Sequence, residues 1–124
     1  MKKLAIPVLL ALATFSFTAA RPFGDARIVD DASGKPIFLQ SKCNKCHTIE
    51  SQTIVRDGKP PEGKQPPDLS GVGLKHDAGW MQKWLLKEVE MNDKKHIKKF
   101  SGTDDELKTL TAWLASLKKP VKVS

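Results

Sequence analysis

Cysteine is scarce in this 124-residue sequence, which contains only Cys43 and Cys46. Small secreted domains commonly use cysteines as scattered pairs that join distant segments of the chain. Two cysteines three positions apart cannot do this, and no further cysteine remains to pair with either of them. A disulfide framework is therefore excluded, and the pair is available for a local function.

Several patterns that indicate other classes of protein are lacking as well. The sequence has no sustained apolar–polar alternation and no internal repeat, which argues against sheets and repeat folds. No basic stripe interleaves with aromatic residues, so nucleic acid is a poor partner. We see no Ser/His/Asp set and no paired carboxylates beside a plausible nucleophile, and we therefore do not expect an enzyme.

The longest apolar stretch runs from residue 4 to residue 17, which is shorter than the ~20 residues that span a bilayer. Two lysines precede it and the small residues 18–20 follow it, which is the layout of a secretory signal peptide. A retained membrane anchor is the alternative, but no basic stop-transfer cluster follows. We therefore expect residues 1–20 to be a signal peptide cleaved after Ala20, and the mature protein to lie in the periplasm or outside the cell without a membrane span.

The rest of the chain is long enough for one small domain. Residues 21–33 are polar and without periodicity, and we interpret them as a mostly irregular extension. The domain itself is expected over residues 34–120, with a short tail over residues 121–124. The formal net charge is +7, and removal of Lys2 and Lys3 with residues 1–20 leaves +5, a moderate positive balance that suits docking to acidic surfaces of partner proteins. We expect a monomer.

The hydrophobic pattern predicts an all-α domain. Pro36 suits the first turn of a helix, so we expect a short helix over residues 36–43. Four prolines and two glycines in residues 50–68 predict a long proline-rich loop. Apolar residues at three- and four-residue spacing predict a second helix from residue 77 or 78 to about residue 89. A lysine-rich loop, residues 92–99, follows it.

A third helix has the strongest signals. Thr103 is suited to the N-cap, and Glu106 three residues later completes a capping box. Acidic residues follow Thr103 and lysines precede Pro120, so the charges complement the helix dipole until the proline ends the helix. The apolar stripe expected to face the core comprises Leu107, Leu110, Trp113, Leu114 and Leu117.

Cys43 and Cys46, with Asn44 and Lys45 between them and His47 after them, form the C-x-x-C-H pattern of c-type haem attachment. Two thiols at this spacing on a helical turn can add to two vinyl groups on one edge of the porphyrin, and the following imidazole is carried under the ring as the proximal iron ligand. A redox-active disulfide usually has a βαβ pattern beside it, and this sequence has none. A zinc site needs a second pair of ligands, which the two other histidines are too widely separated to supply. We therefore predict one covalently attached haem c.

Beyond this motif, residues 34–117 resemble the class I (mitochondrial-type) monohaem cytochromes c. Residues that match the family's N-terminal helix and the C-terminal helix that crosses it are Gly34, Phe38, Leu110, Trp113 and Leu114. The resemblance implies a small all-α cytochrome c fold in which about three or four helices surround one haem.

Pro67, followed by Asp68 and Leu69, resembles the Pro-x-Leu loop of this family. The resemblance implies that the carbonyl oxygen of Pro67 accepts a hydrogen bond from Nδ1–H of His47. Pro67 would then set the orientation of the imidazole that binds iron.

The sequence departs from the family at the sixth iron ligand. Most class I members have a methionine shortly before the last helix, often three residues before an aromatic residue, but the position three before Phe100 is Ile97. His96 stands beside it, and Met91 lies earlier in the chain. Three interpretations stay open: His96 is the distal ligand, Met91 is the distal ligand, or neither binds and the sixth position is open.

An electron carrier is the function that these features favour. The iron would cycle between ferrous and ferric states, exchanging electrons with donor and acceptor proteins whose docking surfaces are acidic. Lysines 94, 95, 98 and 99 around His96 are either a solvated loop or a docking site around the haem edge. The alternative function is a gas or ligand sensor with an open or displaceable sixth position.

Four further residues call for an interpretation. Met81 lies on the apolar side of the second helix, and we expect it in the core. His76 stands beside charged residues at the start of that helix, and we expect it to be solvated. Trp80 and Trp84 either cover the haem, donate to a propionate or pack in the core.

Overall fold

The computed structural model describes residues 31–120. The expected signal peptide, the tail and all but the last three residues of the extension lie outside this part of the chain. The described elements are α1 (Asp31–Gln40), η1 (Cys43–Lys45), η2 (Glu50–Gln52), η3 (Val72–Leu74), α2 (Ala78–Leu85) and α3 (Asp104–Ser116). Within residues 31–120 there are only isolated bridges and no strands, so the predicted all-α fold is confirmed.

The first helix begins earlier than the proline suggested. α1 starts at Asp31, contains Pro36 in its interior and ends at Gln40, so the predicted range of 36–43 is wrong at both ends. Gly34 is buried against Trp113 of α3, and this packing stabilises helix ahead of the proline. The helix ends because Lys42 takes a left-handed conformation with φ of 58°.

The second helix begins as predicted and ends early. The Asp77 side chain accepts a hydrogen bond of 2.7 Å from the backbone N–H of Trp80, which caps α2. The expected end near Val89 is wrong, because α2 ends at Leu85. The Leu85 carbonyl, which Val89 N–H would bond in a longer helix, instead accepts from Phe100 N–H at 2.9 Å, and Lys87 has φ of 62°.

The third helix confirms its predicted start and stripe. The Thr103 hydroxyl accepts from Glu106 N–H at 3.2 Å, and the Glu106 carboxylate accepts from Thr103 N–H at 2.8 Å, which completes the capping box. The helix ends at Ser116, and the segment after it is tied to η3 by a bond of 2.9 Å from Gly73 N–H to the carbonyl of Leu117. α3 is therefore fixed at both ends.

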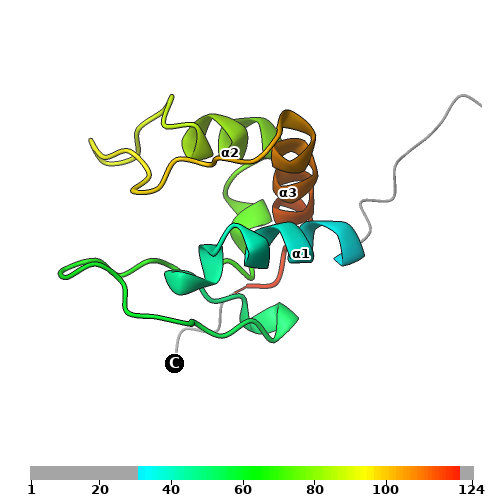
Figure 1. Ribbon diagram of the computed structural model, residues 1–124, viewed down its shortest axis with the longest axis horizontal. Helices are drawn as coiled ribbons and strands as arrows, with labels where there is room; N and C mark the ends of the chain where they lie inside the picture. The colour runs from blue at the N-terminus through cyan, green and yellow to red at the C-terminus, as the bar shows by residue number, and fades with distance from the viewer. Residues whose placement is uncertain (1–30, 121–124) are drawn as a thin grey trace, which may run out of the picture.

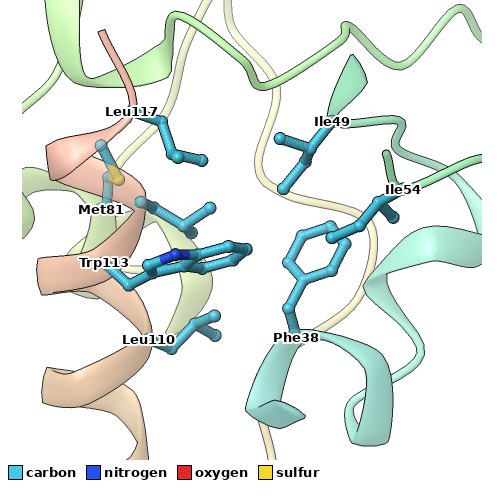
Figure 2. Close-up of a cluster of buried hydrophobic side chains, with 8 residues drawn as sticks. Phe38, Ile49, Ile54, Met81, Leu110, Trp113 and Leu117 are labelled. Carbon is cyan, nitrogen blue, oxygen red and sulfur yellow. The ribbon is translucent and has the colours of Figure 1, made fainter. Parts of the chain in front are cut away.

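The helices pack around one core. α1 crosses α3, and α2 packs against α3 farther along (Figure 1). At the crossing the rings of Phe38 and Trp113 meet edge to face with centroids 5.9 Å apart (Figure 2). Met81 is buried as predicted. The other members of the buried cluster are Ile49, Ile54, Leu110, Leu114 and Leu117.

The long loops extend to one side of the helices. In Figure 1 the proline-rich loop, in green, and the lysine-rich loop, in yellow, leave the helical body on the same side. No helix within the described residues is long and apolar enough to cross a membrane.

Candidate functional site

The C-x-x-C-H turn, residues 43–47, follows directly on the end of α1. The Cys43 carbonyl accepts from the N–H groups of Cys46 and His47 at 3.2 and 3.0 Å, so the turn is wound tightly. Both cysteines are free and half-buried, and Cys43 packs against the core. Burial raises the pKa of the Cys43 thiol to about 11, although the Lys98 ammonium nearby acts in the opposite direction. At neutral pH this sulfur is therefore a protonated thiol.

His47 is oriented by the proline-rich loop. Its Nδ1 lies 2.9 Å from the carbonyl oxygen of Pro67, which is the contact that the resemblance implies. A carbonyl oxygen can only accept, so Nδ1 carries the hydrogen and Nε2 keeps its lone pair. Burial lowers the pKa of His47, the bond to Pro67 opposes this, and the charges of His96 and Arg56 lower it further. The result is a neutral, oriented imidazole with a nitrogen free to bind a metal.

Asp68 holds the segment that carries Pro67. One carboxylate oxygen accepts from the Thr48 hydroxyl at 2.7 Å and from Glu50 N–H at 3.0 Å, and the other accepts from Ser70 N–H at 2.8 Å. Burial alone raises the pKa of Asp68, but these hydrogen bonds outweigh it and hold the pKa below its ordinary value. The sequence analysis assigned Asp68 no role, although its position next to Pro67 could have indicated that it holds this segment in place.

Arg56 links the backbone just before His47 to the backbone just before Pro67. Its Nε donates to the carbonyl of Cys46 at 2.8 Å, and its Nη2 donates to the carbonyl of Pro66 at 3.3 Å. A guanidinium can bridge two carbonyls in this way because its donors form a rigid planar fork. Sequence reasoning missed this residue, since a lone arginine in a long loop belongs to no recognisable pattern.

His96 lies in the lysine-rich loop, beyond a tight backbone turn. Met91 and Lys94 exchange hydrogen bonds of 2.9 and 3.2 Å, and Asn92 and Asp93 between them have positive φ. Nδ1 of His96 then donates to the carbonyl of Lys98 at 2.5 Å, which again leaves Nε2 free. Burial is the main cause that lowers the pKa of His96.

The structure brings the two histidines together across 49 positions of sequence. The ring centroids of His47 and His96 lie 6.2 Å apart, and the ring planes differ by 9°. Met91, the other candidate ligand, has 42% of its surface exposed, and Ile97, in the position where methionine was expected, has 55% exposed.

A row of aromatic rings continues from His96 along α2. Trp84 meets His96 edge to face at 5.6 Å, Trp80 stacks on Trp84 at 5.4 Å, and His76 stacks on Trp80 at 3.7 Å. His76 is half-buried in this stack, so the expectation that it is solvated is wrong. Spacing of four residues places 76, 80 and 84 on one side of the chain, and that signal was available in the sequence.

The sequence model of the cytochrome c family matches residues 32–118 of this chain. The chain belongs to the cytochrome c family. The resemblance to cytochrome c drawn from the motif and the two crossing helices is thereby confirmed. No curated protein and no solved structure matches the chain. Haem-based electron transfer is the function of this family.

Cytochromes c bind haem c covalently through a C-x-x-C-H motif, and Cys43 and Cys46 occupy its two cysteine positions. The residues of this region fit that group: two free thiols adjoin an imidazole whose Nε2 is available, and the ring of a second such imidazole lies 6.2 Å away. The thiols would hold the porphyrin, and His47 would supply the nitrogen donor that its iron requires. Within residues 31–120, no group of three or more histidine, cysteine or acidic side chains could hold a bare metal ion.

Proposed function

We propose that this cytochrome c is an exported monohaem electron carrier whose iron is bound by His47 and His96. The observation that carries the ligand assignment is the arrangement of the two imidazoles, 6.2 Å apart and nearly parallel. Each has its Nδ1–H engaged by a backbone carbonyl, from Pro67 and from Lys98 respectively.

The separation of the rings agrees with the size of an iron site. An imidazole nitrogen binds a first-row metal at about 2.0 Å and lies about 1.2 Å from its ring centroid, so two imidazoles opposed across one iron have centroids roughly 6.4 Å apart. The distance of 6.2 Å between His47 and His96 is close to this value. Backbone carbonyls that engage the far nitrogen of each ligand also raise its basicity and restrict its rotation.

Two features speak against Met91 as the ligand. Its backbone forms the tight turn with Lys94, and 42% of its surface is exposed. We therefore assign Met91 to the loop and His96 to the iron.

A carrier follows from two strong ligands. The bound haem supplies a one-electron ferrous–ferric couple, and the chain around it sets the potential through its axial ligands, burial and hydrogen bonds. If His47 and His96 both bind the iron, a substrate or a gas would have to displace one of the two imidazoles, which favours a carrier over an enzyme or a sensor. Imidazole favours the ferric state more than methionine does, so we expect a potential below that of methionine-ligated relatives.

The proposed location is the periplasm, or the cell exterior, and the proposed partners are electron donors and acceptors with acidic surfaces. The signal-peptide layout of residues 1–20 supports the first part. The formal charge of +5 that remains when Lys2 and Lys3 are removed with residues 1–20, and the lysine-rich loop beside His96, support the second.

Absorption spectra of two variants test the ligand assignment. We expect the ferric wild-type protein to be low-spin and to lack the long-wavelength band of methionine ligation. His96→Ala should give a high-spin iron that binds added imidazole, because it removes one strong ligand. Met91→Ala is the matched control and should leave the spectrum unchanged.

The reverse result would assign Met91 as the ligand and leave an electron carrier of higher potential. A wild-type spectrum that is already high-spin, and that neither variant changes, would reject the bis-histidine carrier and favour the sensor.

A further inference from the structure

Lys98 contacts both the loop that carries His96 and the end of the first helix. Its backbone carbonyl accepts the hydrogen bond from Nδ1 of His96. Its side-chain ammonium donates to the carbonyl of Ser41 at 2.9 Å, a contact between residues 57 positions apart. Among the lysines of the lysine-rich loop, Lys98 is therefore the one that reaches across to the first helix.

The position of Ser41 makes this contact significant. Ser41 follows α1 directly and stands two residues before Cys43, the first residue of the C-x-x-C-H turn. The ammonium of Lys98 also lies close enough to Cys43 to influence the pKa of that thiol. Lys98 thus joins the segment that carries His96 to the segment that carries the haem thiols and His47.

The lysine-rich loop has few other attachments. Phe100 N–H bonds the Leu85 carbonyl after the loop, and the Trp84 ring meets the His96 ring. Lys94 and Lys99 make no side-chain hydrogen bond or ion pair within the described part of the chain, and Ile97 is exposed. A loop with so few buried contacts opens locally at low free energy, so one bond near the ligand affects how often the ligand leaves.

We propose that Lys98 is a latch that keeps His96 on the iron by tying its loop to the backbone of Ser41. Lys98 is a positioning residue, since it acts through His96 and does not itself contact the iron. The proposal rests on the proposed function, in which His96 is the distal ligand. Without the latch the loop opens more often, and the sixth position becomes accessible to external ligands.

Cyanide binding to the ferric holoprotein tests the latch. At neutral pH cyanide is mostly uncharged HCN, so its binding reports opening of the site with little influence from surface charge. Lys98→Met keeps the aliphatic stem and the backbone carbonyl but removes the ammonium. Loss of a hydrogen bond from a charged donor at an exposed site should raise the binding rate roughly fivefold.

Lys99→Met is the matched control, because it removes the same charge from the next residue, which has no such contact. We expect Lys99→Met to bind cyanide at the wild-type rate and Lys98→Arg to lie nearer to wild type than Lys98→Met. The resting spectrum of Lys98→Met should stay low-spin. Equal rates for Lys98→Met and Lys99→Met would overturn the latch.

Failure of the latch can be distinguished from failure of the ligand assignment. If His96→Ala opens the iron but Lys98→Met and Lys99→Met behave alike, only the latch is wrong. If His96→Ala leaves the spectrum unchanged, the assignment of His96 fails, and the latch fails with it.

Discussion

At the scale of single residues, the same device orients both histidines. His47 and His96 come from loops of different composition, yet each donates its Nδ1–H to a backbone carbonyl. A carbonyl oxygen cannot donate, so it selects the tautomer in which Nε2 has the free lone pair. The chain therefore needs no additional carboxylate beside either imidazole to hold the proton in place.

The pKa of Asp68 leads to a pH-dependent prediction. Its carboxylate accepts hydrogen bonds from Thr48 and Glu50, which tie residues 48–50 to the segment after Pro67, and one from Ser70 N–H within that segment. Because its folded pKa is depressed, its contribution to stability is fully present above the ordinary aspartate pKa of 3.8 and is lost as the pH falls through the folded pKa. Asp68→Asn should lower the free energy of unfolding by about 1 kcal/mol at neutral pH, and the difference from wild type should shrink in acid.

Urea unfolding followed by circular dichroism at several pH values measures this difference. Asp57→Asn removes a carboxylate from an exposed position of the same loop and should have little effect at any pH. A gap between Asp68→Asn and wild type that stays constant from neutral to acidic pH would show that the charged form of Asp68 is not what stabilises the loop.

At the scale of helices, close approach of α1 and α3 determines where the C-x-x-C-H turn lies. A Cβ atom at Gly34 would overlap Cβ and Cγ of Trp113, so the two helices touch through a residue without a side chain. Trp113 and Phe38 are fully buried at this crossing. The turn that carries the cysteines follows the same helix, and its position therefore depends on the crossing.

Gly34→Ala should force the two helices apart. Overpacking of a well-packed core typically costs about 1–3 kcal/mol, and we expect a loss of about 2 kcal/mol or more in the free energy of unfolding. Gly79→Ala is the matched control, because a Cβ there would meet only a side-chain oxygen of Asp77 at 3.4 Å. That change lies in the first turn of α2 and should be neutral or stabilising by up to about 1 kcal/mol. Urea unfolding of both variants checks this, and equal stabilities would contradict the account of the crossing.

At the scale of the whole molecule, the positive surface charge suggests that the protein docks to acidic partner proteins. The structure indicates which lysines of the lysine-rich loop are available for this docking. Lys95 lies 3.9 Å from Glu90, in a pair that is about half exposed, and Lys98 is bonded to Ser41. Lys94 and Lys99 are exposed, with ammonium groups that have no partner in residues 31–120. These two lysines are the best candidates for docking.

Changing Lys94 and Lys99 together to Gln should slow electron transfer to an acidic partner and weaken its dependence on salt. Steering by exposed charges acts over a Debye length of about 8 Å at physiological ionic strength, so added salt should suppress the wild-type rate more than the variant rate. Lys108→Gln with Lys118→Gln removes the same charge from exposed positions on α3 and just after it. Stopped-flow rates that are equal for the two double variants would mean that net charge, and not the lysine-rich loop, guides docking.

The mass of the mature protein tests export and haem attachment at once. We expect the mass of residues 21–124 plus one haem, and we expect the haem to survive acid–acetone extraction. Replacing Cys43 and Cys46 by Ala should leave little stable holoprotein, because the covalent bonds that would retain the haem are lost. A mass that includes residues 1–20 would contradict cleavage, and haem lost in acid–acetone would contradict covalent attachment.

The sequence by itself determined the features that depend on short spacing. The C-x-x-C-H motif, the capping box at Thr103 and the stripe of α3 each lie within about four turns of helix. Their roles can therefore be predicted from the sequence before the fold is known. Resemblance to a family added Pro67 and the crossing of two helices, and it left the sixth ligand open between His96, Met91 and neither.

Only the tertiary structure decided the rest, because it depends on contacts between segments that are distant in the chain. The end of α2 is set by Phe100, which takes the Leu85 carbonyl, and the start of α1 is set by packing of Gly34 on Trp113. Arg56 and Lys98 brace the two imidazoles through backbone carbonyls. Every residue has a carbonyl, so outside a family motif such as the one that contains Pro67, the sequence does not indicate which carbonyl accepts a hydrogen bond.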